Sequence, residues 1–131
     1  MSEIRFDHEK LDVYQVSLQF VAWAFELCAR IKGNQRFARE HLLQASQSIT
    51  QNIAEGNGKR SRLDRSRYFE ISRGSALECA SILDVLRVCR TFSPSELEPG
   101  KEMLYRIVSM LSRMTDRPDR VCETEEGYEP V

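Results

Sequence analysis

The sequence predicts an all-α protein: an antiparallel up-down-up-down four-helix bundle followed by a flexible acidic C-terminal tail. In four segments, apolar residues recur at alternating spacings of three and four, which is the period of one helix face. Short breaks rich in glycine or proline separate these segments, and no segment alternates as a half-buried strand does. Because the connections are short, consecutive helices are expected to be antiparallel. A three-helix core with the fourth helix packed outside is the alternative.

The first helix is expected from about Asp7 to Ile31, and it carries two apolar stripes. The stripe expected to face the core consists of Leu11, Tyr14, Leu18, Val21, Phe25 and Cys28. The second stripe, on a neighbouring face, consists of Val13, Val16, Phe20 and Trp23. Since a bundle needs one buried stripe per helix, we expect the second stripe to be exposed and to form a homo-oligomer interface. Gly33 is expected to end this helix in the left-handed conformation.

The second helix is expected over about Arg36 to Glu55, and the third from Leu63 or Asp64. The buried seam of the second helix is predicted to be Leu42, Ser46, Ile49 and Ile53. The buried seam of the third is predicted to be Phe69, Ser72, Ala76, Cys79, Leu83 and Leu86. The run 56–58 contains two glycines, each costing a helix about 1 kcal/mol, so it is expected to end the second helix.

The fourth helix has a clear start signal in the sequence Ser-Pro-Ser-Glu at 93–96. Ser93 is a favoured N-cap, Pro94 suits the first turn, and Glu96 completes a capping box. The apolar period then continues through Leu97, Leu104, Ile107, Leu111 and Met114. The bundle domain is therefore expected to span 1–115, with a tail over 116–131.

Composition bounds the class of protein. The 131 residues suit one domain, and no apolar run approaches the ~20 residues that span a bilayer, so no membrane contact is expected. The start lacks the pattern of a signal peptide, and the cysteines form no Cys-x-x-Cys pair, so we expect a cytoplasmic protein whose Cys28 and Cys79 are buried free thiols. Residues 116–131 carry six acids and two arginines, which leaves a body of charge about +3.

No catalytic or metal-binding pattern is present. Neither His8 nor His41 belongs to the Glu-x-x-His pattern of di-iron bundles or to a His-Glu-x-x-His zinc motif. We therefore expect no cofactor and no enzymatic activity.

Polar residues interrupt the apolar faces of the second and third helices. They are Ser48, Asn52 and Glu55 on the second, and Ser75 and Glu78 beside Gly74 on the third. These groups are expected either to hydrogen-bond between the helices and fix their register, or to form an acidic pocket through Glu55 and Glu78. Gly74 is expected to allow another backbone to approach closely.

A basic cluster occupies the connection between the second and third helices. Its members are Lys59, Arg60, Arg62, Arg65, Arg67 and Arg73, with the aromatic residues Tyr68 and Phe69 nearby. Cations beside aromatic rings suit nucleic-acid backbones and exposed bases, so this cluster is the candidate nucleic-acid contact. A solvated loop that serves solubility is the alternative.

Three short runs carry a family resemblance: Ser-Ile-Thr-Gln-Asn-Ile-Ala-Glu-Gly at 48–56, Gly-Lys-Arg-Ser at 58–61 and Gly-Ser-Ala-Leu-Glu at 74–78. Together with Leu-Asp-Val-Tyr at 11–14, they resemble the four-helix-bundle family known as 23S rRNA intervening-sequence proteins. The resemblance implies a bundle without recognised enzymatic activity and a ring-shaped homopentamer. It also implies an association with RNA, because a related bundle is the RNA-associating accessory protein of diversity-generating retroelements.

Three hypotheses for function follow. The first is a non-enzymatic, RNA-associated oligomer that contacts phosphates through the basic cluster. The second is a scaffold that binds a protein partner and no nucleic acid. The third, an enzyme acting through Glu55 and Glu78, has the least support because no catalytic constellation accompanies these carboxylates.

Overall fold

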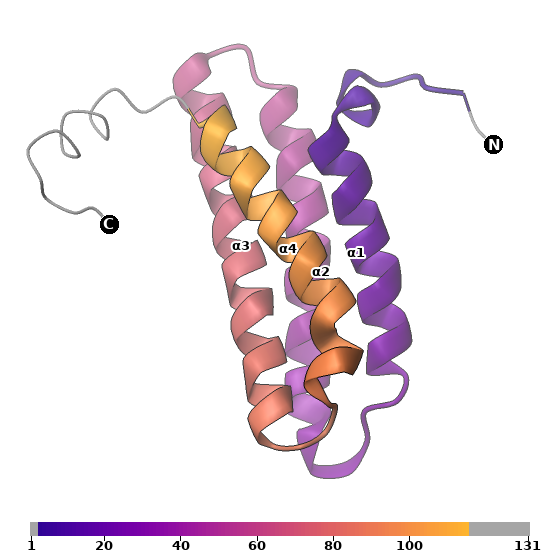
Figure 1. Ribbon diagram of the computed structural model, residues 1–131. Helices are drawn as coiled ribbons and strands as arrows, with labels where there is room; N and C mark the ends of the chain where they lie inside the picture. The colour runs from indigo at the N-terminus through magenta and orange to yellow at the C-terminus, as the bar shows by residue number, and fades with distance from the viewer. Residues whose placement is uncertain (1–2, 116–131) are drawn as a thin grey trace, which may run out of the picture.

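The computed structural model describes residues 3–115, and this part of the chain has four α-helices and no strand, which confirms the all-α prediction. The helices are α1 (Asp12–Cys28), α2 (Arg36–Asn57), α3 (Arg62–Val88) and α4 (Pro94–Met114). Two 3-10 helices, η1 (Asp7–Lys10) and η2 (Gly33–Gln35), precede α1 and α2. In Figure 1 the α2–α3 connection lies at one end of the bundle, and the α1–α2 and α3–α4 connections lie at the other. The predicted acidic tail lies outside the described residues.

α4 is part of the core, so the alternative of a three-helix core is wrong. It packs against both α1 and α3. Its buried side chains are Leu97, Leu104, Ile107 and Leu111. The seams predicted for α2 and α3 are buried as well, from Leu42 to Ile53 and from Phe69 to Leu86. For these three helices the apolar period identified the inward face correctly.

On α1 the second stripe faces the core, while of the first stripe Cys28 is buried and Leu11 and Tyr14 are partly buried. Val13, Val16 and Phe20 lie in the core, and Trp23 is partly buried against it, so the prediction that this stripe is an exposed oligomer interface is wrong. Leu18 and Phe25, expected to be buried, are 40% and 46% exposed. The physical reason is the size of the other residues on the same face of the helix. The inward face continues through the small buried residues Ser17 and Ala24 to Leu27, and small residues let neighbouring helices approach closely.

The ends of α1 also differ from the prediction. The chain makes the single turn of η1, becomes extended at Leu11, and only then enters α1. At the other end the helix stops at Cys28, where the N–H groups of Arg30 and Ile31 bond to carbonyls three residues back. Gly33 does adopt a positive φ of 71°, but it does so at the start of η2, after α1 has ended.

α2 runs two residues beyond its predicted end and includes Gly56, which is buried. A Cβ atom at Gly56 would lie 2.9 Å from Cβ of Tyr68 and 3.0 Å from a ring carbon of Phe69. The glycine therefore lets the start of α3 pack against the end of α2. The helix is closed two residues later, at Gly58.

Serine caps fix the starts of α3 and α4. The Ser61 hydroxyl accepts from the N–H of Asp64 at 3.1 Å. Ser93 and Glu96 form the predicted capping box: the N–H of Glu96 donates to the Ser93 hydroxyl at 3.2 Å, and the N–H of Ser93 donates to the Glu96 carboxylate at 2.8 Å. These caps hold the α2–α3 and α3–α4 connections, both of which carry charged residues.

Candidate nucleic-acid interface

The α2–α3 basic cluster comprises the six cations predicted from the sequence, and it sits on the short connection and the first turns of α3. The connection is short because Gly58 closes α2 and Ser61 already caps α3. Residues 55–73 hold these six cations and three acids, Glu55, Asp64 and Glu70, so the net charge of this stretch is +3. The cluster is therefore positive, but the acids offset half of its charge.

Two members of the cluster form ion pairs within their own helical turns. Lys59 lies 3.3 Å from the carboxylate of Glu55, and its ammonium lies 5.1 Å from the centre of the Tyr68 ring. The hydrogen bond to Glu55 raises the pKa of Lys59, so this side chain remains charged. Arg67 lies 3.2 Å from Asp64. Both cations must give up a neighbouring carboxylate before they can bind a phosphate.

Two further members hold the bundle together. Arg65 donates to the main-chain oxygen of Asn57 at 2.9 Å, which ties α3 to the end of α2. Arg73 donates from Nε to the Ser112 hydroxyl at 2.8 Å, which ties α3 to α4. These contacts give the two arginines structural roles.

Arg60 and Arg62 are exposed, as is Arg67. Among the described residues, the Arg60 side chain takes part in no hydrogen bond or ion pair. Phe69 is buried in the core, so it cannot stack on a base, and Tyr68 is half-buried beside Lys59. The surface can therefore contact phosphates through its exposed cations, but it has no exposed aromatic ring on which a base could stack.

The polar residues of α2 and α3 are only partly brought together. The hydroxyls of Ser48 and Ser75 are 2.8 Å apart across the two helices, and Asn52 donates to the Ser48 hydroxyl at 3.1 Å and to its main-chain oxygen at 2.9 Å. Of these hydrogen bonds, the one between Ser48 and Ser75 crosses from α2 to α3, and such a bond favours one register of the two helices. The two Asn52 bonds lie within α2, so they do not link it to α3.

Glu55 and Glu78 lie at different levels of the bundle. Glu78 pairs with His41, whereas Glu55 pairs with Lys59. His41 and Glu55 are both on α2, and their separation in the sequence corresponds to about 21 Å along a helix axis. These two carboxylates therefore do not share a pocket.

Gly74 has open space around it. A Cβ atom there would meet nothing within 4 Å, so the expected close approach of another backbone is absent within this chain. The residue lies on an exposed face of α3 that also presents Leu77 and Val85. The glycine gives no packing benefit inside the described part of the chain.

Cys28 and Cys79 are buried, as the sequence predicted. Burial raises the pKa of the Cys28 thiol to about 11 and that of the Cys79 thiol to about 12, and Glu78 adds to the second shift. Neither thiol is a nucleophile at neutral pH, because the thiolate is the reactive form. Within residues 3–115 there is also no group of three or more His, Cys, Asp or Glu side chains placed to hold a metal ion, and no helix long and apolar enough to cross a membrane.

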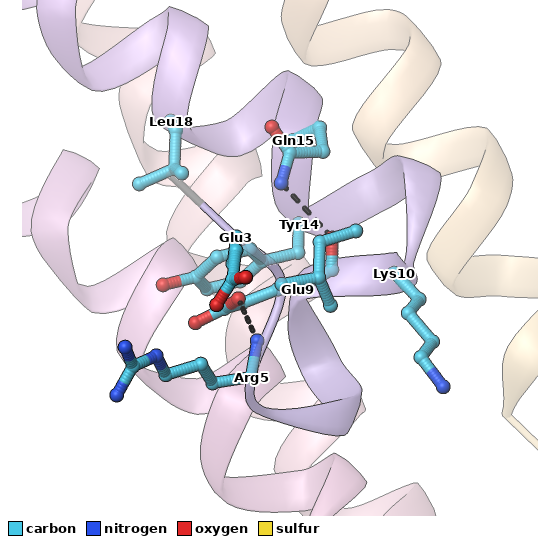
Figure 2. A pocket seen from close by; sticks show the side chains of 8 residues that line it. Glu3, Arg5, Glu9, Lys10, Tyr14, Gln15 and Leu18 are labelled. Atoms are coloured by element: carbon cyan, nitrogen blue, oxygen red, sulfur yellow. Dashed lines mark hydrogen bonds between the residues drawn. The ribbon is translucent and has the colours of Figure 1, made fainter. Parts of the chain in front are cut away.

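An apolar stripe, which we call the α1 outer stripe, lines the outside of α1. It comprises Leu11, which is the N-cap of α1, and Tyr14, Leu18, Val21 and Phe25; Leu11 and Tyr14 are partly buried. Beside its N-terminal half is an open hollow of about 770 Å³, lined by Tyr14 and Leu18 and by the segment that precedes α1 (Figure 2). That segment is held by Glu9, which accepts from the N–H of Arg5 at 2.9 Å and from the Gln15 amide at 3.0 Å (Figure 2). The sequence predicted that all five face the core; Leu11 and Tyr14 do pack against it partly buried, whereas Leu18 and Phe25 are exposed.

Comparison with known proteins gives one family and one fold. The family model described as "23S rRNA-intervening sequence protein" matches residues 9–113. The crystal structure of a protein of unknown function from the S23 ribosomal protein family of Bacteroides thetaiotaomicron matches with a TM-score of 0.74 and 21% sequence identity. The match covers 80% of this chain and 99% of that chain, and at this identity it shows a shared fold. No curated protein matches the chain.

Proposed function

The chain belongs to the 23S rRNA-intervening sequence protein family, and from that premise we propose that it is a non-enzymatic, self-assembling bundle of antiparallel helices that associates with RNA. The observation that carries the RNA contact is the exposed pair Arg60 and Arg62 on the α2–α3 basic cluster. The body of the protein has a charge of about +3, which favours a polyanionic partner. Phosphate contacts of this kind bind RNA without reading its sequence.

Self-assembly is supported by the α1 outer stripe. Its members recur at alternating spacings of three and four, the pattern with which one helix packs along another. Two of them, Leu18 and Phe25, are large and well exposed, and a contiguous apolar surface of this kind is typical of an interface. A second copy of the chain is the proposed occupant. In the pentameric ring that the family resemblance implies, the basic cluster would be repeated and several weak phosphate contacts would act together.

We expect light scattering of the purified protein at micromolar concentration to give several times the 15.2 kDa mass of the chain. Replacing both Leu18 and Phe25 by glutamate should lower that mass, because a charge placed in an apolar interface is desolvated without a partner. Gln19→Glu, an exposed change on the same helix, is the matched control and should assemble normally. A monomeric mass for the unmodified protein would contradict the assembly.

RNA binding is tested with nucleic-acid-free protein and a structured RNA at two salt concentrations. Arg60→Gln with Arg62→Gln should weaken binding. In a plot of the logarithm of the binding constant against the logarithm of the salt concentration, the slope should become less steep by about 0.7 to 0.9 for each phosphate that the variant no longer neutralises. Arg106→Gln with Arg113→Gln, on the exposed side of α4, removes the same charge and is the control. If both double variants bind equally weakly, overall charge is responsible and the α2–α3 basic cluster is not the binding surface.

A protein-interaction scaffold is the second candidate. It is favoured by contacts that already occupy cations of the cluster: Lys59 with Glu55, Arg67 with Asp64, Arg65 with Asn57 and Arg73 with Ser112. If the unmodified protein assembles but binds no RNA even at low salt, this second function replaces the first.

A further inference from the structure

The end of the bundle opposite the α2–α3 basic cluster carries a second group of cations. The α1–α2 and α3–α4 connections meet there (Figure 1). Two contacts join them: Arg30 lies 2.7 Å from the carboxylate of Glu96, and the Thr91 hydroxyl bonds to the Gln35 side chain. Residues that are more than fifty positions apart in the sequence are thus held side by side.

This end carries cations in both of its connections. Residues 29–36 and 87–93 contain five cations and no acid; we call these cations the far-end basic cluster, and they are Arg30, Lys32, Arg36, Arg87 and Arg90. Glu96 neutralises Arg30, which leaves four positive charges. Glu40 and Asp84 lie in the adjoining helical turns, where they contact Arg39 and Lys101.

The remaining four cations are available to a ligand. Lys32, Arg36, Arg87 and Arg90 are exposed, and between residues 3 and 115 their side chains take part in no hydrogen bond or ion pair. A phosphate can therefore bind them without displacing a carboxylate. In the α2–α3 basic cluster, by contrast, Lys59 and Arg67 are each paired with a carboxylate.

The backbone keeps Arg90 in an unfavourable conformation. Its φ is 63°, in the left-handed region, and it follows the last turn of α3. The N–H of Arg90 bonds to the oxygen of Arg87 at 2.9 Å, and that of Thr91 to the oxygen of Leu86 at 3.0 Å, which together form the Schellman motif that ends many helices. Glycine is the usual residue at this position because it adopts the conformation without strain. An arginine here costs stability, and it places a cation at the edge of a surface hollow.

The hollow at this end has about 640 Å³ of open space. Arg87 and Arg90 line it, together with Thr91, Ser93 and Glu96, whose carboxylate pairs with Arg30. Close to the cluster in the sequence, Phe37 follows Arg36 in the first turn of α2 and is 78% exposed. Cations and an exposed aromatic face are groups that bind single-stranded RNA, through its phosphates and through stacking on a base.

We propose that the far-end basic cluster is a second, separate binding surface for single-stranded RNA. Lys32, Arg36, Arg87 and Arg90 contact phosphates, and Phe37 stacks on a base. This surface shares no residue with the α2–α3 basic cluster, so it stands even if Arg60 and Arg62 prove not to contact RNA.

The test uses the full chain, free of nucleic acid, and a short fluorescent single-stranded RNA measured by anisotropy at two salt concentrations. Arg87→Gln with Arg90→Gly should lower the affinity roughly fivefold for each arginine removed at about 0.1 M salt, and it should flatten the salt dependence. The Arg106→Gln, Arg113→Gln variant should bind like the unmodified protein. The Arg90→Gly change should keep or raise the urea midpoint of unfolding, so weaker binding does not reflect a failure to fold.

Phe37→Ala separates stacking from charge. It should weaken binding of the single strand, leave the salt dependence unchanged, and have little effect on a duplex RNA of equal length, whose bases cannot stack on the ring. The proposal is overturned if the Arg87, Arg90 variant binds as tightly as the unmodified protein, or if the α4 control is weakened as much. An unchanged affinity of Phe37→Ala, or equal binding of the duplex, would overturn the assignment to single-stranded RNA.

Discussion

Replacing Gly100 by alanine is expected to lower the free energy of unfolding by about 3 kcal/mol, the upper range for overpacking a core. A Cβ atom at this position would lie 2.3 Å from two ring carbons of Trp23 and 2.9 Å from a third. The Trp23 ring is rigid and packs against Phe20, with 5.7 Å between the ring centres. Alanine normally favours a helix over glycine by up to about 1 kcal/mol, so the steric clash must outweigh that gain.

Urea denaturation of Gly100→Ala and Gly74→Ala side by side measures this effect. Gly74 also lies within a helix, but an added Cβ there meets nothing within 4 Å, so Gly74→Ala should raise stability by about 0.5 to 1 kcal/mol. A Trp23→Leu change combined with Gly100→Ala should recover part of the stability, because a smaller side chain leaves room for the methyl group. Equal stability of Gly100→Ala and the unmodified protein would contradict the close contact between α1 and α4.

Phe20→Ala is expected to lower the free energy of unfolding by about 3 to 5 kcal/mol, the range for removing a buried aromatic side chain. Phe20 is fully buried, so its removal leaves a cavity on the inward face of α1. Since typical domains are stable by about 5 to 15 kcal/mol, the variant should be close to unfolding, and its urea midpoint should be measured at low temperature.

Phe25→Ala is the matched control, since it is the same change on the same helix at a side chain that is 46% exposed. It should lower the free energy of unfolding of a monomer much less than Phe20→Ala does. It should also weaken assembly if the α1 outer stripe is an interface. If Phe25→Ala proved the more destabilising change for the folded monomer, α1 would be rotated as its apolar pattern alone predicts, with the Leu18 stripe inside.

This contrast explains where sequence reasoning succeeded and where it failed. On α2, α3 and α4 a single apolar stripe lies among polar residues, so the spacing of the apolar residues identified the buried face. On α1 both stripes are apolar, and the choice depends on how closely other helices approach. That choice was made by Ser17 and Ala24 at the inward face and by the space that Gly100 leaves for Trp23. Capping signals were local and reliable, as Ser93 and Glu96 show.

The basic clusters show the same division between local and long-range signals. The pairs Lys59 with Glu55 and Arg67 with Asp64 are four and three residues apart, so helical spacing could have indicated that these cations are neutralised. The contacts of Arg65 and Arg73 depend on packing between helices and had no local signal. The far-end basic cluster was missed because its two halves are remote in the sequence. Treating the two connections as neighbours at one end of the bundle would have found it.

The reactivity of the two buried thiols reports how often the helices of the bundle separate. With pKa values of about 11 and 12, Cys28 and Cys79 are almost entirely protonated at neutral pH and shielded from reagents while the bundle is closed. Cys89, which is exposed just after α3, has no such shield. Alkylation at Cys28 and Cys79 is therefore limited by how often helices separate, so its rate reads the free energy of transient opening at the centre of the bundle, residue by residue.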